Sequence, residues 1–324
     1  MSDGASPAAI EHHYDVGTDF YRLWLDTRMV YSCALWPGGL DDDLDGAQTA
    51  KLAWHADGAR VAGAGRVLDV GCGWGSLMSY LVEERAVEQV TGLTLSSDQA
   101  ASITERSDAR TDVRLEDWRD HSPTVPYDGI ISIGAFEHFT RHDLPVSQRR
   151  AVYAGFFDRC ADWLGAGGRL SLQTIAYEDF DIAVGAVSSF FANDIFPESA
   201  LPRLSDIIVT SDSRFRMVQF RNDPAHYEHT LHLWQRRLEA RKDEAMHLVD
   251  RDTYRRYLRY LRVSRAMFDR RVATLYRLVF ERRPVAITGG PGAAGAASGT
   301  AGAASGAAGA VSGAAGVASG EGRP

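Results

Sequence analysis

A glycine-rich turn is the part of this chain whose residue types and spacing most clearly suggest chemistry. The apolar run Val67–Val70, which includes Asp69, leads directly into the Gly-x-Gly-x-Gly segment Gly71–Gly75. This pattern is typical of a buried parallel strand that turns sharply into a helix. Glycines tolerate positive φ angles and let a ligand approach the backbone, and the amides that open the helix can hold a carboxylate. The segment therefore predicts a nucleotide-like ligand on a doubly wound sheet.

The end of the next predicted strand helps to choose among nucleotide ligands. Enzymes that bind dinucleotides carry an acidic residue there, which hydrogen-bonds the ribose hydroxyls. In this chain the segment Val90–Ser96 contains no acid. Thr94 and Gln99 have side chains that can hydrogen-bond a ribose instead. The missing acid argues against NAD and FAD.

The elements that position these residues alternate between strand and helix. We predict strands over Arg66–Val70, Gln89–Leu95, Val113–Glu116, Tyr127–Ile133 and Gly168–Ile175, and helices over Trp74–Glu84, Ser97–Arg106 and Val146–Leu164. This rhythm indicates a parallel sheet with right-handed crossovers. Ligands of such sheets bind at the carboxyl ends of the strands.

The pattern changes after Ile175. We predict helices over Glu178–Phe191, Leu201–Ser211, Ala225–Ala245 and Arg251–Arg271, and strands over Phe215–Arg221 and Thr274–Phe280. An antiparallel last strand beside a parallel sheet suits the seven-stranded, Rossmann-like sheet of class I methyltransferases, and the helices around it would form a lid over the strand ends. The predicted class is α/β.

Composition excludes several other classes. The chain has 324 residues, of which 45% are hydrophobic and 24% charged, as in a globular enzyme. Its net charge of −8 argues against nucleic acid as a partner. Cys33, Cys72 and Cys160 have no metal-type spacing, which suits a reducing cytoplasm. No apolar run is long enough to span a bilayer, and the N-terminus does not look like a signal peptide.

Six motifs in register resemble one family. The chain is similar to the cyclopropane-fatty-acid synthases, which include the mycolic acid cyclopropane synthases, over roughly residues 10–284. The matching stretches are His12–Tyr21, Val30–Trp36, Leu68–Gly75, Gly92–Ser96 with Gln99, Ser132–Phe139, and His226-Tyr227 followed by Thr230-Leu231 and Trp234.

The resemblance implies S-adenosylmethionine (SAM) as methyl donor. By this likeness, the donor-binding residues would gather around three parts of the molecule. Gly71, Gly73 and Gly75, after Asp69, would flank the methionine part, with Tyr31 and Ser32 closing over it; Thr94, Leu95 and Gln99 would contact the ribose and adenosine; and Asp117 and Trp118 would border the adenine.

The resemblance also implies a bicarbonate ion beside the transferable methyl group. Its contacts here would be Cys33, the backbone at Ile133, Glu137 and Tyr227. Methylation of an alkene leaves a carbocation, which must lose a proton before a cyclopropane closes, and bicarbonate can accept that proton. Glu137 can orient the ion if one of the two carries a proton, because two bare anions repel. The walls must exclude water, and we expect Phe136, Phe139, Phe190, Phe191 and Phe196 to form them.

Two features depart from the family pattern. Cyclopropane synthases usually carry a histidine where this chain has Gln173, and an amide can donate a hydrogen bond but cannot titrate. The phospholipid-type synthases also have an extra N-terminal domain, whereas only about ten residues precede His12. The resemblance implies that the acceptor is an unsaturated acyl lipid or carrier-bound acyl chain. The two departures favour the alternative, a small natural product that is methylated on carbon or nitrogen.

Charge and composition divide the chain further. The segment Arg251–Arg283 carries eleven arginines against three acids, a net charge of +8, so it could meet an acyl carrier protein or an anionic membrane surface. From residue 285 onward Gly, Ala and Ser dominate, which predicts a disordered tail. We expect an N-terminal helical cap over residues 1–60 and a methyltransferase domain over 61–284, with its core at 61–176 and its lid and last strands at 177–284.

Overall fold

Seven strands form one mixed sheet in the order β3-β2-β1-β4-β5-β7-β6. The structure is a computed structural model that describes residue 4 and residues 16–106, 108–178 and 199–284. Its strands are β1 (Arg66–Val70), β2 (Gln89–Thr94), β3 (Thr111–Leu115), β4 (Tyr127–Ile133), β5 (Leu164–Tyr177), β6 (Phe215–Asn222) and β7 (Ala273–Arg282). Strands β1 to β5 pair in parallel, and β7 is antiparallel to both β5 and β6. The predicted seven-stranded methyltransferase sheet is confirmed.

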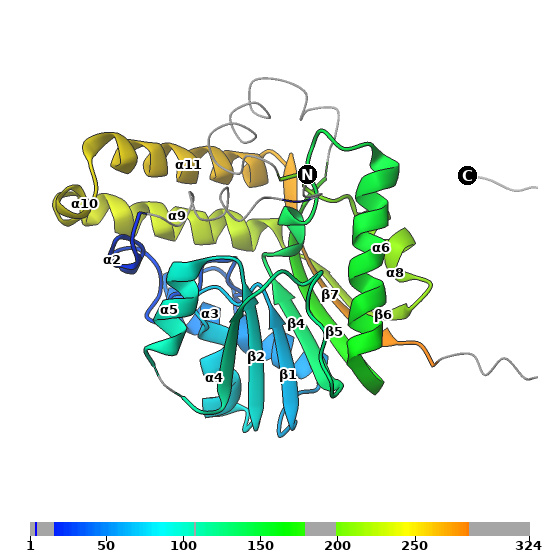
Figure 1. The fold of residues 1–324 in the computed structure, drawn as a ribbon. Coiled ribbons are helices and arrows are strands. Elements are labelled where there is room, and N and C mark those ends of the chain that lie inside the picture. Colours follow the sequence, from blue (N-terminus) through cyan, green and yellow to red (C-terminus); the bar gives the residue numbers. More distant parts are fainter. Residues whose placement is uncertain (1–3, 5–15, 107, 179–198, 285–324) are drawn as a thin grey trace, which may run out of the picture. The chain divides into compact units, whose positions relative to one another are not determined.

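Helices cover both faces of this sheet (Figure 1). They are α2 (Thr18–Arg22), α3 (Leu44–Ala59), α4 (Ser76–Glu84), α5 (Ser97–Thr104), α6 (Val146–Trp163), α8 (Leu204–Ser211), α9 (Pro224–Ala240), α10 (Lys242–Leu248) and α11 (Arg251–Asp269), with a 3₁₀ turn η1 at Phe136–His138. Side chains alternate along a strand. Val67 of β1 accordingly packs in the cluster with α3 and α4, whereas Leu68 and Val70 pack in the cluster with α6.

The glycine turn has the geometry that its residue types predict. Gly71 and Gly75 have φ angles of 82° and 75°, which non-glycine residues rarely adopt. A Cβ atom on Gly71 would lie 2.4 Å from the Cβ of Ala135, so the turn also passes too close to the loop after β4 for a side chain. Gly75 then caps the N-terminus of α4. The turn is therefore fixed against two neighbouring strand ends.

Two predicted elements differ from the structure, and a third lies almost wholly outside the described residues. The single helix expected over Ala225–Ala245 is two helices, and α10 begins with Asp243 and Glu244 in its first turn, where acids favour a helix N-terminus. Strand β5 begins at Leu164, four residues before the predicted start. The helix predicted over Glu178–Phe191 lies almost wholly outside the described residues, as do Phe190, Phe191, Phe196 and the tail predicted over 285–324.

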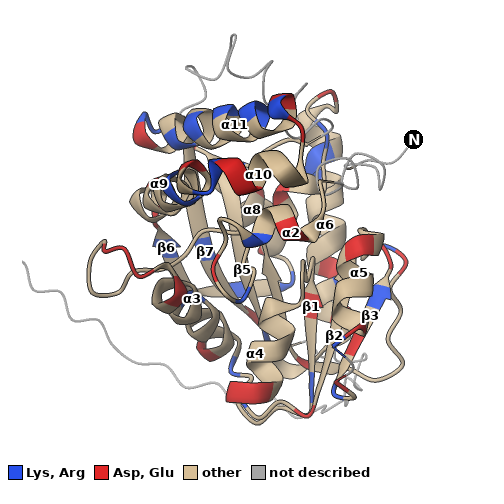
Figure 2. Ribbon diagram, turned by 90° about the vertical axis from the view of Figure 1, so that its left-hand side faces the viewer, with Lys and Arg blue, Asp and Glu red and all other residues tan. Residues whose placement is uncertain are grey.

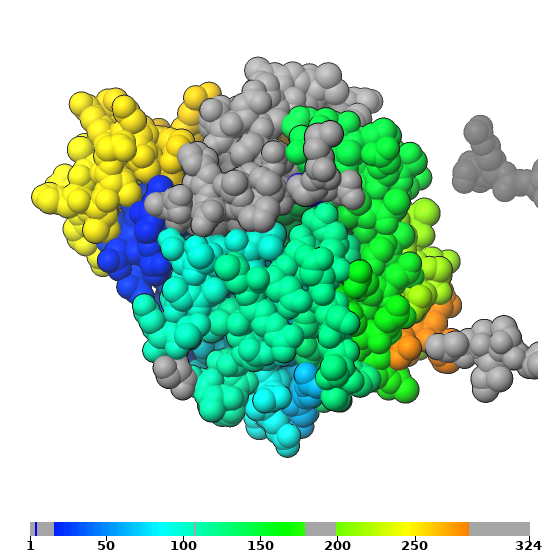
Figure 3. Space-filling model, viewed as in Figure 1, coloured from blue at the N-terminus to red at the C-terminus, as the bar shows by residue number. Residues whose placement is uncertain are grey.

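The C-terminal helices lie across the end of the sheet at which β1 and β4 finish (Figure 1). Helices α9 and α11 pack side by side, and α10 contacts α2. Figure 3 shows the blue N-terminal segment against the yellow helices near the other end of the chain. Among the described residues, no helix is long and apolar enough to cross a membrane.

Candidate active site

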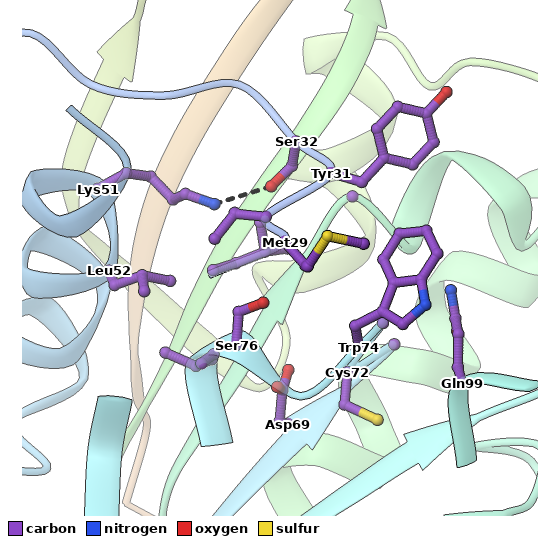
Figure 4. Close-up of a pocket in the computed structure, with 16 residues that line it drawn as sticks. Met29, Tyr31, Ser32, Lys51, Leu52, Asp69, Cys72, Trp74, Ser76 and Gln99 are labelled. Atoms are coloured by element: carbon purple, nitrogen blue, oxygen red, sulfur yellow. Dashed lines mark hydrogen bonds between the residues drawn. The ribbon is translucent and has the colours of Figure 1, made fainter. Parts of the chain in front are cut away.

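A pocket opens to solvent where β1 and β4 end (Figure 4), and the space within it and at its mouth amounts to about 530 Å³. Seven of the predicted site residues line it: Tyr31, Ser32, Asp69, Gly71, Gly73, Gln99 and Ile133. The remaining lining residues are Met29, Val30, Lys51, Leu52, Cys72, Trp74, Ser76, Leu77 and Gly134. The pocket thus combines the glycine turn with the segment that precedes α3, although about 40 residues separate them in the chain.

Asp69 is a buried acid on the wall of this pocket. Asp69 is 2% exposed, and its Oδ2 has no hydrogen-bond partner among the described residues. Burial raises the pKa of Asp69 to about 7, and the nearby Lys51 opposes that shift. A buried carboxylate oxygen without a partner costs free energy. Asp69 is therefore suited to a cationic group on a ligand.

Gln99 enters the pocket in a fixed orientation. Thr94 Oγ1 donates to Gln99 Oε1 at 2.8 Å, and Ser96 caps α5 by accepting from the Gln99 backbone N–H. Because the side-chain oxygen is occupied, the Gln99 amide presents its N–H groups to a ligand. Thr94 thus positions Gln99 instead of lining the pocket itself.

Other predicted donor contacts do not line this pocket. Asp117 pairs with Arg119 at 3.0 Å, and Trp118 packs against Phe139 and Phe156. Leu95 is half-buried, and Gly75 serves as the cap of α4. A role for Asp117, Trp118 or Leu95 in donor binding stays a prediction.

Glu137 is a second buried acid, in the turn that follows β4. Its carboxyl group accepts from Thr174 Oγ1 at 3.0 Å and from the Ile175 backbone N–H at 3.4 Å. Burial raises the pKa of Glu137 to about 7, against the effect of these hydrogen bonds. Near neutral pH a large share of this group therefore carries a proton, which the carboxyl group can donate.

Cys33 and Tyr227 are far apart in the chain, but Cys33 lies against Thr230 of the helix α9 that also carries Tyr227. Thr230 Oγ1 lies 3.9 Å from Cys33 Sγ and accepts from the Ala34 backbone N–H at 3.1 Å. Tyr227 lies one turn earlier on α9, and its buried ring packs at 4.5 Å against Phe268. Burial raises the pKa of Cys33 to about 11, so its thiol stays neutral at physiological pH.

Gln173 is held by a buried arginine that the sequence analysis missed. Arg277 Nε donates to Gln173 Oε1 at 2.8 Å, and Arg277 Nη2 donates to the backbone oxygens of Cys33 and Ala34 at 3.3 and 2.8 Å. Arg277 is fully buried and forms an ion pair with Asp223. A positive charge therefore lies directly behind Cys33 and Gln173.

Sequence signals for two missed residues were present. Arg277 interrupts the apolar strand β7, which is unusual for an arginine unless it is paired. Lys51 shares one face of α3 with Gln48 and His55, at helical spacing, and all three side chains are fully buried. Only Lys51 and Lys242 among the 35 basic residues are lysines. Polar residues at this spacing on the buried face of a helix indicate a binding or catalytic site in the interior.

The basic segment Arg251–Arg283 does not form one surface. Arg277 is buried behind Cys33, and Arg282 reaches the carbonyl of Leu164, at the opposite end of the sheet from the glycine turn. The exposed arginines of α11 are Arg251, Arg255, Arg256, Arg259 and Arg262, and Figure 2 shows the basic stretches of this helix in blue. Arg270, Arg271 and Arg283 are also exposed but lie beyond the end of α11. The basic face is therefore the outer face of α11.

Comparisons with known proteins agree with this geometry. A family model described as mycolic acid cyclopropane synthetase matches residues 3–278. Cyclopropane mycolic acid synthase 2 of Mycobacterium leprae is 37% identical over 272 residues, which cover 78% of this chain and 86% of that protein. The solved structure of the cyclopropane synthase MmaA2 from Mycobacterium tuberculosis superimposes with a TM-score of 0.77 at 30% identity, covering 86% of this chain and 99% of that one. The mycolic acid cyclopropane synthase CmaA1, complexed with SAH and CTAB, gives 0.76 at 31% identity with the same coverage.

Proposed function

Because the chain belongs to the mycolic acid cyclopropane synthase family of SAM-dependent methyltransferases, we propose that it methylates an unsaturated, apolar acyl chain. When bound, SAM supplies an electrophilic methyl group, and bicarbonate supplies a base beside it. The acceptor alkene would attack the methyl carbon as the bond between sulfur and that carbon breaks, which would release S-adenosylhomocysteine and leave a carbocation on the acceptor. Loss of a proton from the added methyl group to bicarbonate would then close a cyclopropane.

We infer that the donor occupies the pocket beside the glycine turn. The positive φ angles of Gly71 and Gly73, which line the pocket, bring bare backbone to the ligand, and Gly75 caps the helix that follows. Asp69 offers an unpartnered buried oxygen to the donor's ammonium group, and Gln99 offers amide N–H groups. Tyr31 and Ser32 close the pocket from the N-terminal side. The pocket residues thus offer partners for the charged amino-acid end of SAM and for its nucleoside.

One observation carries the anion part of the proposal: Glu137 is buried, accepts from Thr174 and Ile175, and has a pKa raised to about 7. A protonated carboxyl group can donate to bicarbonate, whereas an ionised one would repel it. The site residues are Cys33, Ile133, Glu137 and Tyr227, with Gln173 behind Cys33. Arg277 supplies the positive charge that Gln173 lacks.

The acceptor site requires apolar walls, and a buried aromatic cluster lies next to the donor pocket. The rings of Tyr21, Trp24 and Trp234 lie 5.3 to 5.4 Å from the ring of Tyr31, which lines the pocket. Phe136 and Phe139 do not contribute as expected, because they pack against α6 in the core. An aromatic wall excludes water and stabilises a nearby cation.

Gln173 keeps a second outcome open. If the anion beside the acceptor is lost or inactive, the same donor chemistry ends in methylation of carbon or nitrogen without ring closure. SAM with a trideuterated methyl group distinguishes the two outcomes by mass spectrometry of the product. We expect a cyclopropane that retains two of the three deuterons. Retention of all three would refute ring closure and favour simple methylation of carbon or nitrogen.

The outer face of α11 would serve as the docking surface for whatever presents the acyl chain to the enzyme. Its exposed arginines would attract the acidic surface of an acyl carrier protein or an anionic membrane that presents the acyl chain. Arg255, Arg262 and Arg265 each lie within ion-pair distance of one acid, and these acids are Asp252, Glu239 and Glu228 respectively. Because α11 carries more arginines than acids, this helix still has a net positive charge.

A further inference from the structure

Lys51 is a buried cation that the proposed chemistry leaves without a task. It projects from α3, its side chain is fully buried, and it lines the donor pocket. Its ammonium donates to Ser32 Oγ at 2.8 Å, as Figure 4 shows. This is the one hydrogen bond that Lys51 makes among the described residues, although an ammonium has three donors. A buried charge with so few partners is costly.

The amino-acid end of SAM also has charges that need partners in the pocket. It carries an ammonium and a carboxylate, and both must leave water. Asp69 suits the ammonium, but it would repel the carboxylate. Among the described residues that line the pocket, Lys51 is the one cation. Ser32 contacts Lys51 through its oxygen, so its hydroxyl proton remains available to a ligand.

We propose that Lys51 is the positioning residue that provides the positive charge for the carboxylate of the donor's methionine end, acting through the Ser32 hydroxyl. Lys51 donates to Ser32 Oγ, and Ser32 donates its proton to the carboxylate. Lysine suits this task because its ammonium is a compact point charge on a flexible chain. The proposal deepens the donor pocket described above and rests on it.

The charged surroundings of Lys51 support this assignment. The charged and titratable groups around it, from every element that packs on it, are Asp26, Cys33, Asp69, Arg277 and His55. Burial lowers the pKa of Lys51 to about 7, while Asp26 opposes the shift and Arg277 adds to it. A carboxylate that binds nearby would favour the charged ammonium. Donor binding above pH 7 should therefore be coupled to uptake of a proton by Lys51.

The test compares SAM with decarboxylated SAM, which keeps the ammonium and lacks the carboxylate. Isothermal titration calorimetry of the full chain without acceptor gives Kd for both donors. The wild type should bind SAM about tenfold to a hundredfold more tightly, as expected for a charge-assisted hydrogen bond. Lys51→Met and Ser32→Ala should abolish this preference, whereas Lys242→Met, which removes the exposed lysine of α10, should retain it.

A second measurement needs no variant, which matters if Lys51→Met does not fold. At pH 8, titrations in buffers of different ionisation enthalpy give the protons taken up with each donor. Because both donors carry the ammonium, the effect of Asp69 cancels in the difference. SAM should take up more protons than decarboxylated SAM, by up to about one. Equal uptake, or a preference for SAM that survives in Lys51→Met, would mean that the backbone amides of α4 hold the carboxylate alone and would overturn the proposal.

If SAM does not bind in this pocket at all, the measured Kd values will differ from those expected when only the role of Lys51 is wrong. Asp69→Asn should weaken both donors if the pocket is the donor site. If Asp69→Asn and Lys51→Met both leave the two Kd values unchanged, the donor binds elsewhere. If Asp69→Asn weakens binding and Lys51→Met leaves the preference for SAM intact, the pocket is right and the role of Lys51 is wrong. None of these outcomes depends on the acceptor or on ring closure.

Discussion

Arg277 Nε donates to the side-chain oxygen of Gln173 at 2.8 Å, although 104 residues separate them in the chain. The bond fixes the Gln173 amide so that its oxygen faces the guanidinium, and Gln173 Nε2 then lies 3.4 Å from the carbonyl of Cys33. Gln173, at the position where the family resemblance predicts a histidine, is thus part of a buried, charged network. The network joins the N-terminal segment, β5 and β7.

Replacing Arg277 by glutamine should destabilise the protein strongly. Asp223 would lose a buried ion pair, and the carbonyls of Cys33 and Ala34 would lose a donor. Breaking a buried pair costs about 3 to 5 kcal/mol. Urea unfolding measures the change. Arg216→Gln is the matched control, because Arg216 pairs with Glu281 on the exposed face of β6 and should contribute less than about 1 kcal/mol. Equal losses in both variants would contradict the network.

The contribution of Glu137 to the free energy of unfolding should decrease as pH rises from about 4.5 to about 7. Burial raises the pKa of Glu137 from 4.5 to about 7, so between these values the folded protein binds a proton that the unfolded chain has released. Stability therefore decreases as pH rises through this window. Glu137→Gln removes this contribution. Between pH 5 and pH 8 its free energy of unfolding should fall by about 2 to 3 kcal/mol less than that of the wild type. Parallel curves would exclude a raised pKa at Glu137.

The same variant should also lose activity. Glu137→Gln replaces one carboxyl oxygen with an NH₂ group, so it can no longer accept from both Thr174 and Ile175, nor exchange a proton. We expect kcat at pH 7 to fall about tenfold or more, with little change in the Kd for SAM. Unchanged turnover would refute the assignment of Glu137 to the anion site.

A methyl group on Gly71 should weaken donor binding. Gly71→Ala places a Cβ atom 2.4 Å from the Cβ of Ala135, at a φ of 82°, so the turn must move. If the displaced turn loses a share of its contacts with the donor comparable to the usual cost of overpacking, about 1–3 kcal/mol, the Kd for SAM should rise about fivefold to 150-fold. Gly167→Ala is the control: its φ is 72°, but no heavy atom lies within 4 Å of an added Cβ. If both variants bind SAM equally well, the close approach at Gly71 is unimportant.

Removing positive charge from α11 should raise KM only for an acceptor that is attached to an acidic carrier protein or embedded in an anionic membrane. With Arg251, Arg256 and Arg259 replaced by glutamine, KM for an acyl chain on an acidic carrier protein or in anionic vesicles should rise, more at low than at high salt. A short, soluble acceptor should show unchanged kinetics. Arg114→Gln, on the exposed strand β3, is the control. Comparing carrier and vesicles shows which surface docks, and an unchanged KM with both would rule out docking on α11.

The sequence by itself determined the fold and the position of the glycine turn. Strands β1 and β4 have the predicted bounds, because a run of apolar residues that ends in glycine suits few structures besides a buried strand at a turn. The motifs that carry the family resemblance are local for the same reason. Each depends on a few consecutive residues whose backbone conformation is set by their own types.

The tertiary structure decided which charges meet. Lys51 and Ser32 are 19 residues apart, and Arg277 and Ala34 are 243 apart, so no local pattern could show that they touch. Burial then changed their chemistry, because the pKa values of Lys51, Asp69 and Glu137 all shift to about 7 only when water is excluded. A residue's type is written in the sequence, but its protonation at neutral pH depends on what the fold packs around it.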